Sequence, residues 1–467
     1  MADYRRVTSV LVEELVKIVG AKNVTVDPEK METYSHDEET DPRYQHMPEV
    51  VVFPDTAAQI AEIMQLANRE LIPVVARGGG TGLAAAAVPL FGGIVVSTER
   101  MNQVLEIDEE AMYMVVQPGV RTDDVQKAAK EKGMFYAGDP CSGDSCVIGG
   151  NVATNAGGNR AIKYGTTRNQ VYGFEVVTPL GKIVRLGGRL EKSTTGYSLD
   201  HLVMGSEGTL GIITEITLRL KPMPQNVIDL LAIFPTIDQA IGIVAKVIKA
   251  GITPTCVEFM DNATVKSVEH FLKAKQPHSD VGNYIIIQVE GQSDEDIEDK
   301  SVLLDELCMT NGALEVLVAD PAKIWHARKS FLEAAREESL IQSKEDMVVP
   351  VNRIAALMHE AAEISRKYSF ITRIASHAGD GNVHFHVLKG DMSEQEWDSK
   401  LKAFQKEIYV LVYKLGGKLS GEHGIGYKRR QLMEEYADPV ELEMMRAIKK
   451  ALDPNLILNP GKIFLVE

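Results

Sequence analysis

The chain has 467 residues, 45% of them hydrophobic and 25% charged, which is an ordinary globular composition with enough apolar material for two or three domains. Its net charge of −16 disfavours a surface for nucleic acid or anionic lipid, because both need basic patches. No apolar run is long enough to span a membrane and the N-terminus has no secretory signal core, so we expect a cytoplasmic protein.

The first half of the chain predicts short strands and glycine-rich turns with few long helices. We expect a helix over residues 8–20, a strand over 49–53 and a helix that ends near residue 67. Further strands are expected over 72–76, 93–97, 113–117 and 173–177.

The pattern changes after Lys221-Pro222-Met223-Pro224. Strands predicted over 227–234 and 285–289 are each followed by a helix, over 237–250 and 293–310. More helices are expected near 322–339, 351–368 and 394–414, and the end of the chain from 453 reads as a loop. This rhythm predicts a second domain of the α+β class with an antiparallel sheet.

Glycine-rich segments follow several of the predicted strands. The run Arg77-Gly78-Gly79-Gly80-Thr81-Gly82 offers backbone N–H groups with no Cβ in the way, an arrangement that binds anionic oxygens such as those of a pyrophosphate. The dinucleotide fingerprint G-x-G-x-x-G fails because its third glycine is Leu83, which disfavours a nicotinamide-binding unit. Similar segments occupy 140–144, 149–158 and 205–213, although any one of them alone could be a turn.

Two short motifs hold four of the eleven histidines. In the first, Asp380-Gly381 predicts a hairpin that brings His377 and His384 together, with His386 on the same face of its strand as His384. The second is Glu422-His423 between glycines. A single histidine is more often structural, but two histidines and a carboxylate suit a divalent first-row cation with positions left open for substrate.

Taken in order, the glycine-rich segments of residues 46–225 resemble the FAD-binding domain of the FAD-linked oxidases, which have the vanillyl-alcohol-oxidase (PCMH-type) fold and include D-lactate dehydrogenase, the glycolate oxidase flavin subunit and D-2-hydroxyglutarate dehydrogenase. The resemblance implies that Arg77–Gly82 wraps the pyrophosphate, and that the other segments line the rest of FAD. Because the first loop has no histidine, we expect FAD to be bound non-covalently. The cofactor-binding residues that the resemblance implies are Arg77, Gly78, Gly79, Gly80, Thr81, Gly82, Pro140, Ser142, Gly143, Asp144, Gly149, Gly150, Asn151, Thr154, Asn155, Gly157, Gly158, Glu207, Gly208, Gly211, Ile213, Asn459 and Lys462.

Residues 226–467 resemble the C-terminal half of the same family. The resemblance implies that His377, His384 and Glu422 bind one divalent metal ion, zinc, iron or manganese, and that His423 is the catalytic base. Arg328, in a Trp-x-x-Arg motif, would grip a substrate carboxylate with help from Lys344, and Asn382 would hold the geometry of the hairpin turn. Without the family, Lys344 would be interpreted as a surface cation.

The implied architecture is α+β and has four parts: an N-terminal helical segment over 1–45, a PCMH-type FAD-binding domain over 46–225, a cap or substrate domain with an antiparallel sheet over 226–415, and a C-terminal segment over 416–467. The last part would complete the active site and return to the FAD domain through Asn459-Pro460-Gly461-Lys462.

The predicted function is FAD-dependent, metal-assisted oxidation of a small 2-hydroxy acid, D-lactate first, to the 2-oxo acid, with hydride passing to flavin N5. The four cysteines form no C-x-x-C pair, so an external acceptor is expected, such as an electron-transfer flavoprotein, a quinone or respiratory subunit, or oxygen. We also expect an oligomer or a complex. His386 and Leu332 depart from the pattern of the hydroxyglutarate enzymes and favour a smaller acid.

Several alternatives remain open at this point. The substrate could be glycolate or 2-hydroxyglutarate rather than lactate. An aryl-alcohol or sugar oxidase on the same fold would not need the carboxylate clamp. A non-catalytic flavin subunit that only relays electrons would not need the histidine motifs, and a metallohydrolase would be colourless.

Overall fold

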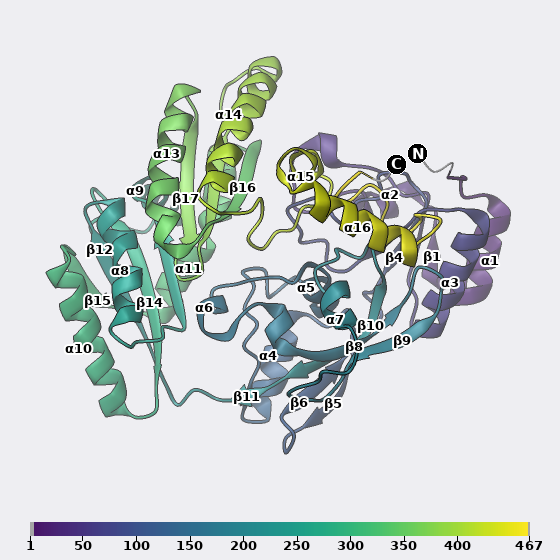
Figure 1. Ribbon diagram of the computed structural model, residues 1–467, viewed down its shortest axis with the longest axis horizontal. Helices are drawn as coiled ribbons and strands as arrows, with labels where there is room; N and C mark the ends of the chain where they lie inside the picture. The colour runs from purple at the N-terminus through teal and green to yellow at the C-terminus, as the bar shows by residue number, and fades with distance from the viewer. Residues whose placement is uncertain (1–3, 466–467) are drawn as a thin grey trace. The chain divides into compact units, whose positions relative to one another are not determined.

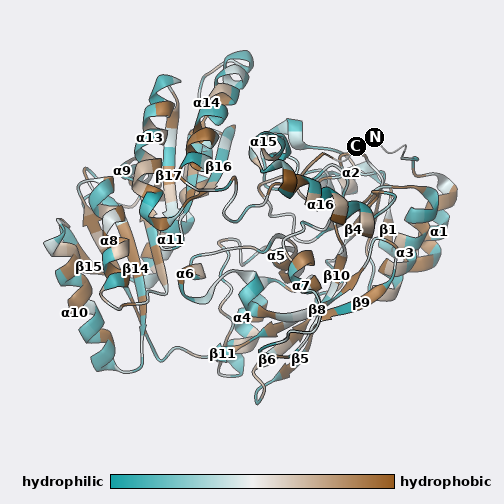
Figure 2. Cartoon of the chain, in the orientation of Figure 1, coloured by the Kyte–Doolittle hydropathy of each residue, from teal (hydrophilic) through white to brown (hydrophobic). Residues whose placement is uncertain are grey.

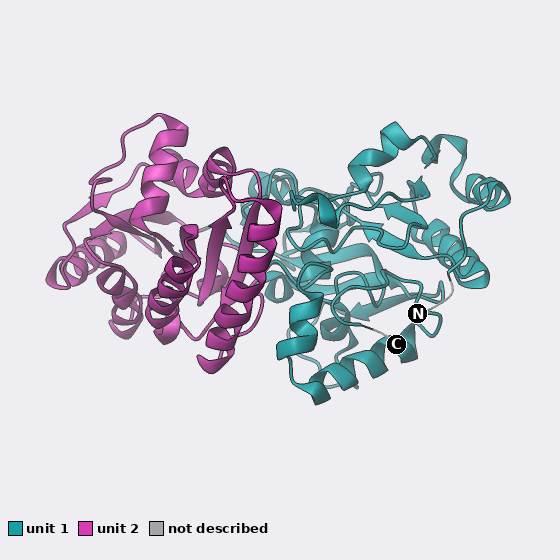
Figure 3. Ribbon diagram, turned by 90° about the horizontal axis from the view of Figure 1, so that it is seen from above, with its two compact units in different colours: residues 1–157, 166–223, 423–467 teal, residues 158–165, 224–422 magenta. Residues whose placement is uncertain are grey.

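The computed structural model describes residues 4–465, which divide into two compact units (Figure 3). Unit 1 comprises residues 4–157, 166–223 and 423–465, and unit 2 comprises 158–165 and 224–422. The predicted α+β class is confirmed, since helices and largely antiparallel sheets are combined throughout. No helix within residues 4–465 combines the length and the apolar character that crossing a membrane requires.

The first sheet of unit 1 has the strand order β1-β2-β4-β3. Strands β2 (Val50–Val52), β4 (Ile94–Ser97) and β3 (Val74–Arg77) are parallel, and β1 (Val24–Thr25) is antiparallel to β2. Helices α1 (Ser9–Val19) and α3 (Ala57–Glu70) share an apolar core with this sheet. The short helix α2 (Pro28–Met31) precedes β2. The same core contains Ile457 and Leu458, so the end of the chain packs against the first sheet.

The second sheet of unit 1 is antiparallel, with the order β5-β6-β10-β8-β9. Its strands are β5 (Val104–Asp108), β6 (Tyr113–Val116), β10 (Ile212–Arg219), β8 (Val171–Val177) and β9 (Ile183–Gly187). Its core includes apolar residues of α4 (Thr122–Glu131), α5 (Ile148–Thr154) and α7 (Leu199–Val203), and β7 (Met134–Phe135) pairs with β11 (Lys221–Pro222). Helices α15 (Arg430–Tyr436) and α16 (Pro439–Leu452), which the sequence reasoning did not identify, complete the unit (Figure 1).

Unit 2 is built on a seven-stranded antiparallel sheet of order β15-β12-β14-β13-β17-β18-β16. Its strands are β12 (Asn226–Phe234), β13 (Cys256–Met260), β14 (Asn283–Gly291), β15 (Glu315–Val318), β16 (Gln342–Val348), β17 (Ile371–His377) and β18 (Asn382–Leu388). The contiguous hairpin of β17 and β18 places the predicted histidine motif inside the sheet. The antiparallel sheet predicted for this half of the chain is therefore confirmed.

Two groups of helices pack on this sheet. The larger group is α8 (Ile237–Lys249), α10 (Asp294–Thr310), α13 (Ile354–Lys367) and α14 (Glu394–Lys414), and the smaller is α9 (Asn262–Leu272), α11 (Pro321–Lys329) and α12 (Phe331–Glu338). Hydrophilic and hydrophobic residues alternate along these helices, as expected for amphipathic helices that cover a sheet (Figure 2). The short helix α6 (Ala161–Tyr164) also belongs to unit 2, where Lys163 and Tyr164 both bond to Glu290.

Two predicted helices of unit 2 differ from the observed ones, and one observed strand was not predicted. The helix expected near 322–339 is two helices, α11 and α12, that meet at Ser330, whose hydroxyl donates to the carbonyl of His326. The helix expected over 351–368 begins with a 3-10 turn. Strand β16 is the unpredicted one: its residues 342–346 are all polar and show no apolar alternation, although all of them are buried.

Candidate active site

One face of the sheet in unit 2 is lined with polar side chains. The register pairs Glu258 of β13 with His377 of β17, and Asp346 of β16 with His384 of β18. Residues directly opposite each other in an antiparallel sheet point to the same side, and so do residues two apart on one strand. The pairing of His377 with Asn382 therefore places all five side chains on a common face.

The predicted metal ligands meet on this face. Atom Nε2 of His377 lies 3.5 Å from Oε1 of Glu422, atom Nε2 of His384 lies 3.3 Å from the same oxygen, and the two imidazole rings are 5.0 Å apart. The structure therefore brings together the three residues that the sequence analysis selected as ligands. Each offers one ligand atom, and the three atoms lie within 4.8 Å of one another.

The donor atoms fit a divalent cation. Atom Nε2 of His377 is buried and makes no hydrogen bond with any residue in the described part of the chain, which is costly for a polar atom unless a ligand occupies the site. Burial lowers the pKa of His377, but the carboxylates of Glu258 and Glu422 outweigh that effect and raise it well above its usual value. Two imidazole nitrogens and one carboxylate oxygen are the donor set of a catalytic first-row metal site with open positions.

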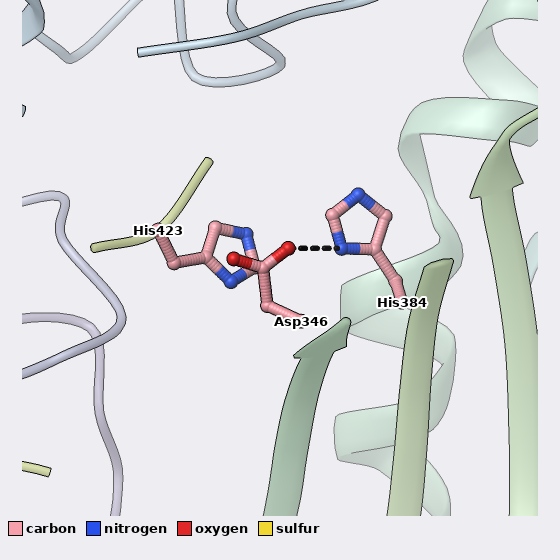
Figure 4. A group of neighbouring side chains, drawn as sticks. All are labelled: Asp346, His384 and His423. Carbon is pink, nitrogen blue, oxygen red and sulfur yellow. Dashed lines mark ion pairs between the residues drawn. The ribbon is translucent and has the colours of Figure 1, made fainter. Parts of the chain in front are cut away.

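Asp346 organises the loop that carries Glu422. Its Oδ2 accepts hydrogen bonds from the backbone amides of Gly421 and Glu422, both at 3.1 Å, and from the Ser420 hydroxyl at 2.5 Å. Its Oδ1 accepts one from the Asn382 amide at 2.7 Å. Figure 4 shows Asp346 beside His384 and marks their ion pair, 3.7 Å long. One wholly buried carboxylate thus fixes the backbone of one ligand and lies against the ring of another.

The predicted substrate cation Arg328 is 3% exposed and paired with Glu258. Nε of Arg328 lies 3.0 Å and Nη2 lies 2.8 Å from Oε2 of Glu258, which itself has no exposed surface. The other oxygen of Glu258 lies 2.8 Å from Nδ1 of His377. The Trp-x-x-Arg motif is on helix α11, where Trp325 Nε1 donates to Asp229 of the sheet, so the motif packs against the polar face.

The other predicted cation, Lys344, has no exposed surface. It is the register partner of His386, so it lies on the polar face and is not the surface cation that the sequence without the family would indicate. His386 Nδ1 lies 2.9 Å from Oε1 of Gln342, and its ring centroid is 4.4 Å from that of Phe331. The side chain of His386 is therefore held in one orientation between an amide and an aromatic ring.

The predicted base His423 is the first residue of the C-terminal segment of unit 1. The loop that follows it is fixed by Glu207, whose two oxygens accept hydrogen bonds from the amides of Ile425 and Gly426, each at 2.7 Å. Burial raises the pKa of Glu207, although these two bonds oppose the shift. The carboxylate of Glu207, predicted to contact FAD, is used here to hold the loop.

The first glycine-rich loop has the properties of an anion-binding loop. The amides of Gly79, Gly80, Thr81 and Gly82 donate no hydrogen bond to any residue between positions 4 and 465. A run of unsatisfied amides at a strand end is a binding site for anionic oxygens. A Cβ on Gly79 would lie 2.6 Å from the carbonyl oxygen of Ser145, so this glycine permits the close approach of a second predicted loop.

Several predicted cofactor residues have structural partners inside unit 1. The guanidinium of Arg77 donates to the carbonyls of Thr33 and His36, at 2.8 and 2.7 Å. The amide of Asn151 donates to Thr122, and Asn155 ends helix α5 in the left-handed conformation. The glycines at 149 and 150 lie in α5, and an added Cβ on the second would meet open space.

Asn459 and Lys462 lie in the segment that returns to unit 1. Asn459 donates to the carbonyl of Glu207 at 2.7 Å, and Lys462 Nζ donates to the carbonyl of Val88 at 2.6 Å. Both line a cavity of about 300 Å³, together with aromatic rings such as that of Tyr4. Burial lowers the pKa of Lys462 to about 7, against the opposing charges of Glu207 and Asp37.

Residues 223–463 match the family of FAD linked oxidases, C-terminal domain, and residues 48–187 match the FAD binding domain. The chain belongs to the FAD-linked oxidase family. The resemblance inferred from the sequence is thereby confirmed.

Among the relatives of this FAD-linked oxidase are D-lactate dehydrogenase of Anaerostipes hadrus, 37% identical over 98% of both chains, and glycolate oxidase subunit GlcD of Bacillus subtilis, 37% identical over 98% of this chain and 97% of the relative. D-2-hydroxyglutarate dehydrogenase of Stutzerimonas stutzeri is 34% identical over 97% and 98%. The solved structure of p-cresol methylhydroxylase with substrate bound shares the fold with a TM-score of 0.80 and 19% identity, over 99% of this chain and 98% of that one.

Two functional candidates of the FAD-linked oxidase escaped the sequence reasoning. Glu258 contacts His377 and Asp346 contacts His384, yet neither carboxylate belongs to a histidine motif. The available signal was weak: Glu258 interrupts the short apolar strand β13, and Asp346 is the last residue of the polar run 342–346 on β16. Their roles depend on which residues of neighbouring strands are paired, and this register cannot be predicted from the local sequence.

Proposed function

We propose that this FAD-linked oxidase oxidises a small 2-hydroxy acid, D-lactate first, to the 2-oxo acid. The observation that carries the proposal is the convergence of His377, His384 and Glu422 on the polar face of the sheet, since a pure electron relay would not need it. The names of the relatives, D-lactate dehydrogenase, glycolate oxidase subunit and D-2-hydroxyglutarate dehydrogenase, support this class of substrate. Glycolate and 2-hydroxyglutarate are the alternatives.

The proposed roles follow from the chemistry of each side chain. Arg328 and Lys344 bind the substrate carboxylate, a task suited to the planar guanidinium. Bound non-covalently, FAD would supply the hydride acceptor for the substrate carbon. His377, His384 and Glu422 would hold a divalent ion, zinc, iron or manganese, which would polarise the 2-hydroxyl group. His423 takes the hydroxyl proton, since an imidazole has a natural pKa near neutrality.

The proposed acid is short because the polar face is filled by large side chains. His386 is fixed by Gln342 and packs on Phe331, and all three are buried. Leu332, next to Phe331, offers no polar group to a second carboxylate. These features favour lactate over 2-hydroxyglutarate.

The electrons must leave the reduced flavin through another molecule. We propose an electron-transfer flavoprotein as the acceptor, with a quinone, a respiratory subunit or oxygen as the alternatives. A cytoplasmic location and assembly into an oligomer or a complex are part of the same proposal.

The test is anaerobic bleaching of the flavin absorbance by D- and L-lactate, glycolate and D-2-hydroxyglutarate, before and after chelation of metal ions. We expect D-lactate to bleach the flavin fastest and chelation to abolish the reaction. The variant His423→Asn should slow the reaction by ~10²–10⁴. His359→Asn changes an exposed histidine on α13 and serves as the control.

Each outcome distinguishes the proposed function from one of the alternative functions. A chelated enzyme that still bleaches at the full rate would refute the metal-assisted mechanism. A protein whose flavin no hydroxy acid reduces would support the electron-relay or aryl-alcohol readings instead. A preparation without flavin absorbance would favour a metallohydrolase.

A further inference from the structure

Glu258 makes two kinds of contact with its two oxygens. Oε1 lies 2.8 Å from Nδ1 of His377. Oε2 accepts a hydrogen bond from Nε of Arg328 at 3.0 Å and forms an ion pair with its Nη2 at 2.8 Å. The side chain has no exposed surface. The contact with His377 is set by the backbone, because the two residues are register partners in neighbouring strands.

The orientation of the His377 ring follows from this contact. An ionised carboxylate only accepts hydrogen bonds, so Nδ1 of His377 must carry the hydrogen that faces Glu258. The other nitrogen, Nε2, is then directed at Oε1 of Glu422, 3.5 Å away. This is the nitrogen that is buried and makes no hydrogen bond within residues 4–465.

Glu345 shows what a structural buried carboxylate looks like in the same sheet. It is 1% exposed and lies on the opposite face of β16, where Ser343, Gln405 and Tyr409 donate to it. Its donors are hydroxyl and amide groups of the core. Glu258 instead bonds to an imidazole of the metal-ligand cluster and to the cation proposed for substrate binding.

We propose that Glu258 is a positioning residue that orients His377 for metal binding and ties that ligand to Arg328. The inference rests on the proposed function and deepens it. Carboxylates that accept the second N–H of a ligating histidine hold the tautomer and ring orientation that the metal requires. Because one carboxylate serves both partners, metal binding and binding of the substrate carboxylate share a single support.

The test compares Glu258→Gln with Glu345→Gln in the full-length flavoprotein. A glutamine has one acceptor oxygen, so either His377 or Arg328 faces an amide hydrogen instead of an acceptor. After removal of metal ions, each protein is titrated with Co²⁺ alone, and the visible absorption of the bound ion gives the dissociation constant. We expect Glu258→Gln to weaken Co²⁺ binding ~10- to 100-fold and to shift the spectrum. Glu345→Gln should bind Co²⁺ as the wild type does.

A second measurement needs no variant of Glu258. In the zinc-loaded wild type, ¹⁵N-histidine NMR should show His377 with a hydrogen on Nδ1 and the metal on Nε2. The inference about Glu258 would be overturned if His377 held the metal through Nδ1, or if Glu258→Gln left the Co²⁺ affinity and spectrum unchanged. Either result would leave the proposed function standing. A wild type that binds neither ion would overturn the metal assignment of the proposed function as well, so the two failures are distinct.

Discussion

Replacing Glu207 with glutamine should loosen the loop that follows His423. The two oxygens of Glu207 each accept one backbone amide, from Ile425 and Gly426, both at 2.7 Å. Glutamine keeps one oxygen, so its NH₂ group must face an N–H donor and one amide loses its partner. A buried polar group left unsatisfied costs about 1–3 kcal/mol, which corresponds to a change of about 5- to 150-fold in the local opening equilibrium.

Hydrogen–deuterium exchange of a peptide that covers residues 423–430 measures this effect directly. Exchange of the two amides should accelerate by the factor given above, while the substrate-dependent reduction rate falls because His423 is less well held. Glu215→Gln is the control, since Glu215 pairs with Arg185 at the surface of the second sheet. Exchange within threefold of the wild type in Glu207→Gln would refute the reasoning.

Three further changes test other parts of the molecule. Gly79→Ala should lower FAD affinity by ~5- to 150-fold, because the added Cβ would lie 2.6 Å from a backbone oxygen. The measurement compares the flavin absorbance of this variant with that of Gly242→Ala, whose added Cβ meets open space. Equal FAD occupancy of the two variants would contradict the prediction. Asp346→Asn should weaken Co²⁺ binding ~10- to 100-fold, since the amide of Glu422 loses its acceptor; unchanged affinity would count against it. Lys462→Met tests the pH dependence of stability in flavin-free protein. The pKa of Lys462 is about 7 in the folded protein and 10.5 as the ordinary value, so between these pH values the unfolded chain binds more protons than the folded one. As the pH rises through this range, the free energy of unfolding of the wild type should therefore increase by up to ~1.4 kcal/mol per pH unit, an increase that the variant lacks. Urea unfolding at several pH values in that range would show parallel curves if the pKa is not depressed.

The parts of the candidate site that lie in short contiguous motifs could be predicted from the sequence. His377 and His384 are joined by one hairpin, and its Asp380-Gly381 turn was sufficient to predict that their rings meet. The Gly79–Gly82 loop likewise follows directly from a strand. Glycines and a tight turn act locally, so their consequences can be derived without knowing the rest of the fold.

Strand β16 marks where that reasoning stopped. Its polar run, with Lys344, Glu345 and Asp346 in succession, looks solvated, yet all three are buried because alternate residues serve opposite faces of the sheet. Glu345 meets Tyr409 of helix α14, and Asp346 meets the loop of Glu422. Such burial is stable only when every polar group finds a partner from distant parts of the chain, and those partners cannot be assigned from spacing.

The closing segment of unit 1 has a consequence for biosynthesis. Strand β3 lies at the edge of its sheet and is bridged on its outer side by Leu458, while Asn459 donates its amide to Val74. A ribosome delivers those last residues only after all of unit 2 has emerged. The nascent flavin domain must therefore wait with an open strand edge, a known starting point for aggregation, so overproduction should benefit from slower synthesis or from chaperones.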